Sequence, residues 1–400
     1  MKFDENVLYF VPSKLSGPRY PLFDIATWKN GLPFKKIDFS SAGRPIIKIA
    51  ELNNGITDST SFTDGEYGKD VFLQKGDMVF SWSGNPKTSI DTYIYDLPDG
   101  WLNQHIFKVT ANEEYVSNNY LYYVLKYLKP RFTEIASNKQ TTGLGHVTIA
   151  DLKRISVIIP SKELQEKIVG IIKPIDDRIR NNTAINDNLE QQAALLFSEW
   201  LDQCTENATI GDLSENILDY TPASEAMVRL LNSSDVTEGV FPVAPLLPNN
   251  DLKGHFKKRF HFGDILYSEI RPRNHHYGLV LFDSSEYIAS TRLMVIRALE
   301  DKVSAALLYQ YLLLPDVEAE FTLKTESRSG TFPQGNYADM ASIIVPYSHI
   351  DTQKDISAIL TQIRQTIAAN QQENQRLTEL RDTLLPKLMS GELDVSDIDL

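Results

Sequence analysis

Hydrophobic residues recur every three or four positions in two long stretches of the chain, which is the spacing of coiled-coil helices. In the first stretch, 162–201, they are Leu164, Ile168, Ile171, Ile175, Ile179, Ile185, Leu189, Leu196 and Trp200. In the second, 350–389, they are Ile356, Ile359, Ile363, Ile367, Leu377, Leu380, Leu384 and Leu388. Each helix would be about 60 Å long at 1.5 Å per residue. We expect Pro174 and Pro386 to kink or shorten the helices locally.

Shorter hydrophobic runs precede each long helix. The runs 45–49, 77–82 and 105–109 are rich in β-forming residues and are separated by Gly, Asn, Asp and Pro, so they are predicted to be strands. Residues 119–128 have helical periodicity, and 303–314 are their counterpart. Each half of the chain is therefore predicted to contain a globular domain of mixed α and β structure.

The sequence repeats itself once at a steady offset. Residues 76–81 (GDMVFS) return as 263–268 (GDILYS), and 157–160 (VIIP) return as 343–346 (IIVP). A further match, LQEKI at 164–168 and TQKDI at 352–356, gives an offset of 188 residues, where the first two give 187 and 186. A solenoid would repeat every 20 to 50 residues or so, and the longer offset indicates a duplicated domain instead.

These patterns predict an α+β fold. Two similar mixed α/β domains are separated by two long antiparallel coiled-coil helices and are related by a pseudo-two-fold internal repeat. The predicted boundaries are 1–160 for the first domain and 161–204 for the central helix. The second domain is predicted at 205–347, and the C-terminal helix with an acidic tail at 348–400.

An asparagine lies near the middle of each predicted helix. Asn182 falls in the gap between Ile179 and Ile185, and Asn370 falls in the equivalent gap after Ile367. If the helices pack antiparallel about a pseudo-two-fold axis, equivalent midpoints meet, and Asn182 is expected to approach Asn370. A polar residue on such a seam can fix the register of the helices at some cost in stability. The alternative is that both asparagines lie on the solvated flank.

Composition places the chain among ordinary globular proteins, with 42% hydrophobic and 23% charged residues. No hydrophobic run approaches the roughly 20 residues that cross a bilayer, and the first residues lack the pattern of a secretory signal, so we expect a cytoplasmic protein. The single cysteine, Cys204, is interpreted as a packing or surface thiol. A net charge of −13 argues at first against nucleic acid as a partner. Basic residues nevertheless gather in 253–261 and 271–276.

Polar loops follow the repeated Gly-Asp strand, at 83–87 in one copy and 271–276 in the other. Arginine suits bidentate contact with guanine, and asparagine or glutamine with adenine, so such loops could read base edges. The alternative is a merely solvated loop. Further candidates come from the aligned segments 103–105 and 290–292, and from two polar stretches near 139 and 328 that could contact phosphates. The predicted DNA-binding residues are Lys35, Lys36, Ser83, Asn85, Lys87, Asn103, Gln104, His105, Lys139, Gln140, Lys257, Lys258, Arg259, Arg271, Arg273, Asn274, His275, His276, Arg292 and Arg328.

Catalytic motifs are missing from the sequence. There is no GxxxxGK[ST], HExxH or GxSxG pattern. The segment Asn85-Pro86-Lys87-Thr88 lacks the aromatic residue of an adenine-methyltransferase motif. The adjacent His275 and His276 have no further ligands at metal-binding spacing. We therefore predict no catalytic residue, no metal site and no bound cofactor in this chain.

The whole chain resembles the specificity subunits of type I restriction-modification systems. The resemblance rests on the duplicated plan, on Pro160 followed by LQEKI at 164–168, and above all on 380–393 (LRDTLLPKLMSGEL). It implies a bacterial or archaeal protein with two target-recognition domains. Each would read one half of a split, asymmetric DNA site, and the helices would set the gap between the halves.

The resemblance also implies partner subunits. Two modification subunits would carry the S-adenosylmethionine site, and two restriction subunits bound through them would carry ATP and Mg²⁺. Hydrophobic residues on the outside of the helices, such as Leu195, Phe197 and Trp200, would either dock the partners or pack within the helix pair. Two other interpretations remain open from the residues alone: a coiled-coil scaffold that joins two protein-binding domains, and a stand-alone methyltransferase.

Overall fold

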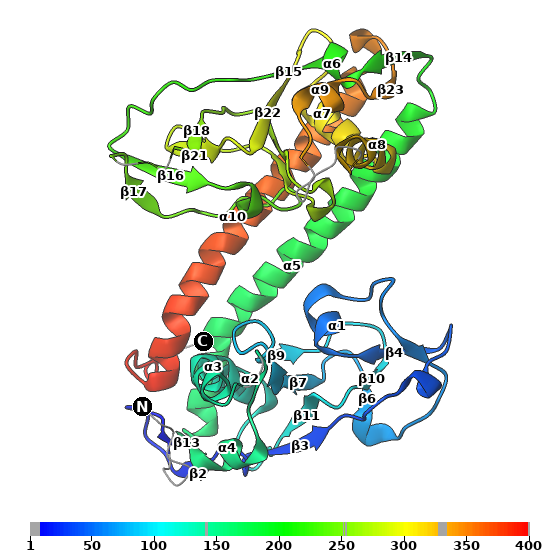
Figure 1. Cartoon of the computed structure of the whole chain (residues 1–400). Coiled ribbons are helices and arrows are strands. Elements are labelled where there is room, and N and C mark those ends of the chain that lie inside the picture. The colour runs from blue at the N-terminus through cyan, green and yellow to red at the C-terminus, as the bar shows by residue number, and fades with distance from the viewer. Residues whose placement is uncertain (1–8, 141–142, 251, 253, 327–333, 399–400) are drawn as a thin grey trace. The chain divides into compact units, whose positions relative to one another are not determined.

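The computed structural model describes residues 9–140, 143–250, 252, 254–326 and 334–398 (Figure 1). The chain forms two compact units. Unit 1 comprises residues 1–177 and 377–400, and unit 2 comprises residues 178–376. Each unit therefore contains one globular domain together with a segment of both long helices.

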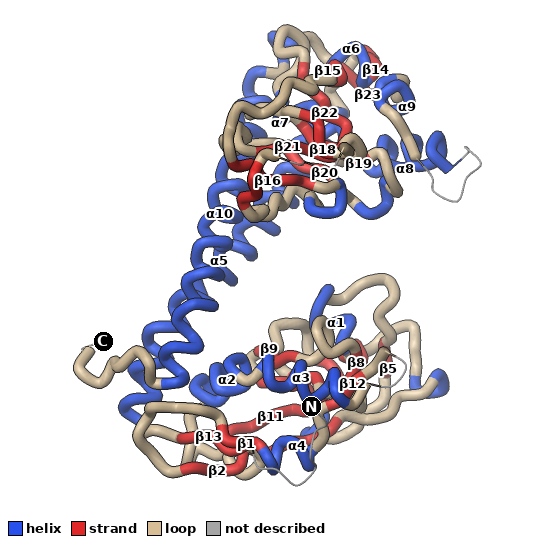
Figure 2. Tube along the Cα trace, turned by 60° about the vertical axis from the view of Figure 1, so that its left-hand side comes forward, coloured by secondary structure: helices blue, strands red, loops and turns tan. Residues whose placement is uncertain are grey.

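The described residues of unit 1 form two four-stranded sheets and two smaller ones. The first sheet is antiparallel and has the order β3 (Ala26–Asn30), β11 (Ile106–Ala111), β7 (Met78–Ser81), β9 (Asp91–Ile94). The second has the order β5 (Phe62–Thr63), β4 (Arg44–Ile47), β10 (Gly100–Leu102), β6 (Phe72–Leu73), and its β4 and β10 are parallel. The smaller sheets are β1 (Tyr9–Phe10), β13 (Ile155–Ile158), β2 (Arg19–Pro21), seen side by side in Figure 2, and the pair β12 (Gly145–His146), β8 (Ser83–Gly84). The helices of this domain are α1 (Ile49–Asn54), α2 (Asn118–Tyr127), α3 (Lys129–Asn138) and α4 (Ile149–Arg154).

Unit 2 repeats this plan. Its antiparallel sheet has the order β15 (Ser214–Asn216), β22 (Leu293–Ala298), β19 (Ile265–Ser268), β20 (Tyr277–Leu279). Its second sheet has the order β17 (Leu246–Pro248), β16 (Met227–Leu231), β21 (Tyr287–Ser290), β18 (Phe256–Lys258), with β16 and β21 parallel. A further pair is β14 (Glu206–Thr209) and β23 (Ile344–Tyr347), and the helices are α6 (Ile210–Leu213), α7 (Ala305–Leu312), α8 (Pro315–Glu326) and α9 (Tyr337–Ala341). The matching strand orders confirm the predicted duplication and the α+β fold class.

The repeated Gly-Asp sequence forms the turn that begins β7 and β19. Both glycines have a left-handed backbone, with φ of 96° and 88°, which only glycine adopts readily. The aspartate that follows each glycine forms a salt bridge with a basic side chain on the neighbouring strand. Asp77 lies 2.7 Å from Lys108 Nζ, and Asp264 lies 2.7 Å from Arg297 Nε. The repeated Gly-Asp sequence is therefore a structural element of both domains.

The two long helices are continuous and antiparallel. Helix α5 (Lys162–Leu201) and helix α10 (Lys354–Ser390) both extend past their internal prolines. In unit 1, Arg381 Nη1 of α10 donates to Asp176 Oδ1 of α5 at 3.1 Å. In unit 2, Arg364 of α10 pairs with Glu190 of α5. As residue numbers rise along α5, those of the partners fall along α10, which confirms the predicted antiparallel direction.

The asparagines lie on the seam between the helices, but the predicted pairing of Asn182 with Asn370 is wrong. Asn182, of which 1% is exposed, donates to Asn374 Oδ1 at 2.9 Å, and Asn370 donates to Asn186 Oδ1 at 2.8 Å. In an antiparallel pair, a residue meets its own counterpart only at the axis, which here lies at Ala184. The offset of 188 residues carries Asn182 onto Asn370 and Asn186 onto Asn374, so the two asparagine bridges are counterparts of each other.

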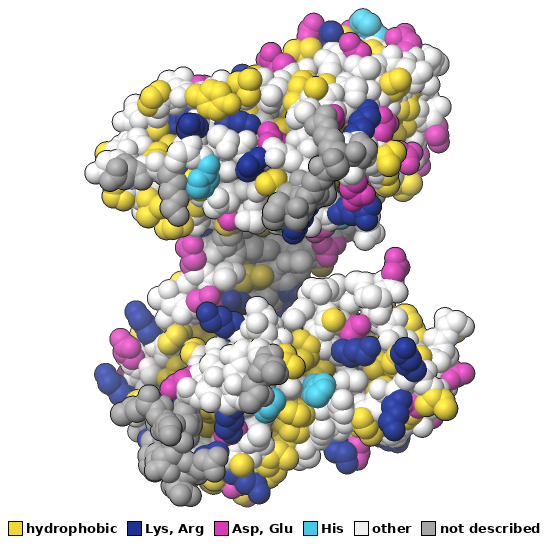
Figure 3. All heavy atoms as spheres, in the orientation of Figure 1, with side chains coloured by type: hydrophobic (Ala, Val, Ile, Leu, Met, Phe, Trp, Pro, Cys, Tyr) yellow, Lys and Arg dark blue, Asp and Glu magenta, His cyan; other side chains and the backbone are white. Residues whose placement is uncertain are grey.

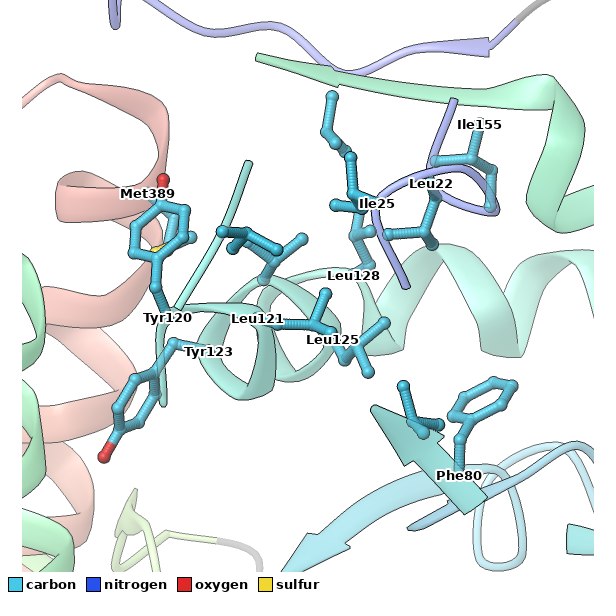
Figure 4. Packing of buried hydrophobic residues seen from close by; sticks show 14 of the residues in the cluster. Leu22, Ile25, Phe80, Tyr120, Leu121, Tyr123, Leu125, Leu128, Ile155 and Met389 are labelled. Atoms are coloured by element: carbon cyan, nitrogen blue, oxygen red, sulfur yellow. The ribbon is translucent and has the colours of Figure 1, made fainter. Parts of the chain in front are cut away.

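In each unit, the segments of the long helices pack on the globular domain through α2 or α7. In unit 1, Tyr120, Leu121 and Leu125 of α2 point into a buried cluster that also contains Met389 of α10 (Figure 4). The segment after α10 belongs to the same core, because Val395 is 1% exposed. The predicted acidic tail is therefore packed on unit 1 over the residues that the structure describes.

A buried glutamine anchors the start of α5 to this domain. Gln165 is fully buried; its Nε2 donates to the carbonyls of Tyr115 and Pro160 at 3.0 Å each, and its Oε1 accepts from the N–H of Ser117 at 2.9 Å. Its counterpart near the start of α10, Gln353, is also fully buried, and its Nε2 makes the two equivalent carbonyl contacts. Its Oε1 has no partner among the described residues. The glutamine of the repeated motif, Gln165 in LQEKI and Gln353 in TQKDI, thus fixes the start of a long helix to its domain. We call these two contacts the clamps at Gln165 and Gln353.

Candidate nucleic-acid interface

In unit 1 the polar loop after β7 is held by a short strand pair. His146 of β12 pairs with Ser83 of β8, and the N–H of Val147 donates to the carbonyl of Trp82 at 2.8 Å. The N–H of Trp82 in turn donates to the carbonyl of His105 at 3.2 Å. Three segments distant in sequence therefore lie side by side at residues 82, 105 and 146 through backbone pairing; we call these three residues platform 1.

Unit 2 builds the same backbone arrangement. A β-bridge joins Ile270 to Gln334, and the N–H of Gly335 donates to the carbonyl of Glu269 at 2.8 Å. The N–H of Glu269 donates to the carbonyl of Arg292 at 2.9 Å. Glu269, Arg292 and Gln334 thus occupy the positions that Trp82, His105 and His146 occupy in unit 1, and we call them platform 2.

The side chains of platform 2 form a hydrogen-bonded chain. Arg292 Nη1 donates to Gln334 Oε1 at 2.7 Å, and Gln334 Nε2 donates to Glu269 Oε2 at 3.0 Å. In platform 1 the Trp82 indole N–H donates to Asn30 at 3.0 Å, and its ring lies 5.5 Å from that of His105. The sequence predicted a role for His105 and Arg292 but missed the other four platform residues. The aligned strands were a signal for Trp82 and Glu269.

The second polar loop, 271–276, is held in a strained conformation. Arg271 and His275 have φ of 48° and 54°, a left-handed backbone that residues other than glycine rarely adopt. The ring of His275 lies between two carboxylates, with Nδ1 2.9 Å from Glu238 and Nε2 3.0 Å from Glu318. The hydrogen bond that His275 donates to Glu238, together with the charge of Glu318 and the hydrogen bond to it, raises the pKa of His275 against the opposing effect of partial burial. Arg273 reaches Glu326 at 3.3 Å. The loop is thus tied to α8 by charged contacts.

Two predicted DNA-binding residues are buried, and these predictions are wrong. Lys258 is 3% exposed and donates to the carbonyl of Leu293 at 2.7 Å, and burial lowers the pKa of Lys258 despite the nearby Glu269. It shares the inner face of β18 with Phe256, two residues away, as the alternation of a strand requires. Asn103 is 9% exposed, and its N–H pairs with the carbonyl of Ile47.

Other candidates are half-buried and already engaged within the domain. Lys139 Nζ contacts both carboxylate oxygens of Asp151 at 2.6 Å. Arg259 donates to the carbonyl of Ser285 at 2.6 Å. Ser83, Gln104 and His276 are also half-buried.

The remaining candidates are exposed. They are Lys35, Lys36, Asn85, Lys87, His105, Gln140, Lys257, Arg271, Arg273, Asn274 and Arg292. Arg328, and Lys253 of the predicted basic cluster, lie outside the described residues. Figure 3 shows Lys and Arg side chains on the visible face of both units, interspersed with acidic ones.

Two other kinds of feature are absent from the part of the chain that the structure describes. No group of three or more His, Cys, Asp or Glu side chains there is arranged to hold a metal ion. None of the helices described is both long enough and apolar enough to span a membrane.

The repeated fold defines a duplicated protein with two similar α+β domains. Comparison with known proteins identifies the family. The family model of the type I restriction modification DNA specificity domain matches residues 19–191 and 240–379. The chain belongs to this family, which confirms the predicted resemblance and a role in DNA specificity rather than catalysis.

Individual relatives agree with this assignment. The chain is 35% identical over 179 residues to the HindI specificity subunit of Haemophilus influenzae, an alignment that covers 44% of this chain and 39% of that protein. It is 22% identical over 368 residues to the MjaVIII specificity subunit of Methanocaldococcus jannaschii, covering 83% and 82% of the two chains. The crystal structure of a type I restriction-modification S subunit from M. genitalium matches with a TM-score of 0.62 at 16% identity, covering 94% of this chain and 96% of that one. This last likeness shows a shared fold.

Proposed function

We propose that the chain is the specificity subunit of a type I restriction-modification complex, and that each globular domain reads one half of a bipartite, asymmetric DNA site. The observation that carries this proposal is the pair of platforms. Their backbones are equivalent, and their side chains differ at every position. A duplicated domain with different side chains on one scaffold suits two different half-sites.

The long helices are proposed to set the gap between the half-sites. Each helix is a single element of about 40 residues, or about 60 Å. That length exceeds the roughly 34 to 36 Å between successive major-groove positions on one face of B-DNA. The seam of asparagines supports a fixed register, since Asn182 and Asn186 each hold a specific partner on α10. A helix pair that cannot slip is suited to measuring a distance.

Two modification subunits are proposed to dock on the same helices. Hydrophobic side chains remain exposed there: Leu195 and Ile185 of α5 are 62% and 46% exposed, and Leu380 and Ile359 of α10 are 46% and 44% exposed. Such residues are typical of a surface that a partner covers. Phe197, by contrast, is 1% exposed and belongs to the core of unit 2, so the core alternative holds for that residue.

The catalytic cofactors are proposed to bind to the partners. The modification subunits would supply S-adenosylmethionine, and restriction subunits bound through them would supply ATP and Mg²⁺. A reader of chromosomal DNA would work in the cytoplasm, at the nucleoid.

A selection experiment tests this function. The chain, purified with its modification subunit, is mixed with random double-stranded DNA, and the bound fragments are sequenced. Recovery of one motif with two fixed halves and an unread gap is expected. Sequence-blind binding, or none, would instead favour a scaffold that joins protein partners. Methyl transfer by the purified chain alone would favour the stand-alone enzyme.

A further inference from the structure

The two platforms present different chemistry at equivalent backbone positions. Platform 2 offers a guanidinium, an amide and a carboxylate. Platform 1 offers an indole ring and two imidazoles. The strand pairing beneath them is the same, so side chains there can change without altering the fold. Positions of this kind are where a duplicated reader can acquire two specificities.

We propose that the platform residues select the bases of each half-site, and that Arg292 reads a guanine in the half-site of unit 2. This inference rests on the proposed function. In this proposal, residues beside the loop 271–276 select the base, whereas other residues contact only the phosphate backbone of the DNA.

Arg292 has the geometry that such a contact needs. Its side chain is exposed, and one of its five N–H donors is bound to Gln334. Gln334 is held in turn by Glu269, so the guanidinium is oriented before DNA arrives. Loss of rotamer freedom on binding is thereby reduced. The remaining donors can form the bidentate pair with O6 and N7 of guanine in the major groove.

Platform 1 cannot make that bidentate contact. The single indole donor of Trp82 is bound to Asn30, and its ring is stacked at 5.7 Å on Phe107. His105 Nε2 lies 3.3 Å from Gln104 Nε2, which leaves an imidazole and an amide edge. An amide suits the N6 and N7 edge of adenine. The half-site read by unit 1 is therefore expected to use different contacts from that of unit 2.

Methylation mapping of platform variants tests the inference. Cells express the chain with its modification subunit, and the methylated motif is compared for wild type, Arg292→Gln, Arg292→Lys and His105→Gln. Lys354→Gln serves as the control, because it removes one exposed positive charge from unit 2 at the start of α10, away from the platform. Co-purification with the modification subunit confirms that each variant is folded.

Both Arg292 variants are expected to lose preference for guanine at one position of one half-site by about tenfold or more, the order expected for a bidentate pair. The gap and the other half-site should stay unchanged. Arg292→Lys keeps the positive charge but cannot form the bidentate hydrogen bonds of a guanidinium. This variant therefore distinguishes a contact with the base from attraction to the phosphates. His105→Gln should alter only the opposite half-site, and Lys354→Gln should alter neither.

Some results would overturn the inference. The first is that both Arg292 variants keep the wild-type motif and the wild-type preference for guanine. The second is that methylation weakens equally at all positions of the motif, as the loss of a phosphate contact would cause. If Arg292→Gln does not fold, Gln334→Ala, which removes only the exposed support, should relax the same position, and an unchanged motif there would count against the platform. Failure of the proposed function has a different signature, because the wild-type chain would then produce no split motif.

Discussion

Lengthening the two helices together should lengthen the gap in the recognised DNA. The perturbation inserts seven residues after Ala184 in α5 and seven after Gln372 in α10, which are counterparts at the axis of the helix pair. Each asparagine bridge keeps both of its members on the same side of the insertions. Seven residues are close to two helical turns, so the hydrophobic stripes stay aligned to within about 20°.

The magnitude follows from helix geometry. Seven residues add about 10.5 Å at 1.5 Å per residue, which is about three base pairs at 3.4 Å each. One contact between α10 and the globular domain of unit 2 is lost, because Gln375 Nε2 donates to the carbonyl of Phe241 at 2.6 Å across the insertion point. A neutral hydrogen bond of this kind contributes about 1 kcal/mol, which the unit should tolerate.

The assay is methylation mapping of cells that express the lengthened chain with its modification subunit. We expect both half-sites to be retained and the gap to grow by about three base pairs. As a control, the same insertion in α5 alone would shift every pair on one side of it and should abolish a defined motif. A doubly lengthened chain that methylates the original gap would refute the idea that the helices measure distance.

Three other predictions concern separate parts of the molecule. Exchanging residues 205–347 with those of a related subunit should change one half of the recognised motif, and a simultaneous change in both halves would contradict the two-reader account. Replacing Gln165 by Met should speed hydrogen exchange of the Ser117 amide by about tenfold or more, because this amide donates to Gln165 Oε1 and would lose its acceptor. The matched variant Gln353→Met should leave exchange of the equivalent Ser304 amide unchanged, because Gln353 Oε1 accepts no hydrogen bond from the described residues. The raised pKa of His275 means that its contacts with Glu238 and Glu318 are fully present below the ordinary imidazole pKa of about 6.5 and weaken as pH rises through the raised value. The protection of the amides in 271–276, measured as exchange rates corrected for intrinsic base catalysis, should therefore fall as pH rises above about 6.5, and His275→Gln should remove that fall.

The duplicated fold could be predicted from the sequence because its signals are local. A spacing of three and four residues marked α5 and α10, and a short motif repeated at a steady offset marked the two domains. The pairing of Asn182 was missed by one helical turn, because a sequence repeat gives the offset between counterparts and not the position of the axis that relates them. The axis is set by how the helices pack on each domain, which includes the clamps at Gln165 and Gln353.

The candidate site was predicted only in part. Lys258 was predicted from its charge alone, although its position two residues after Phe256 in the same strand already indicated that both side chains lie on the buried face. Platform 1 joins Trp82, His105 and His146, which are 23 and 41 residues apart and meet only through backbone pairing of three segments. No periodic pattern in the sequence encodes such a contact between distant segments. The chemistry of the site therefore became visible only once the strands were placed.

The most direct test of the central claim is long-read mapping of adenine methylation in two strains that differ only in this chain, both expressing the neighbouring modification subunit. The account predicts one split motif that is methylated when the chain is present and unmethylated when it is absent, with both half-sites and the gap read from the same data. An identical methylation pattern in the two strains, with the chain expressed and assembled with its partner, would contradict it.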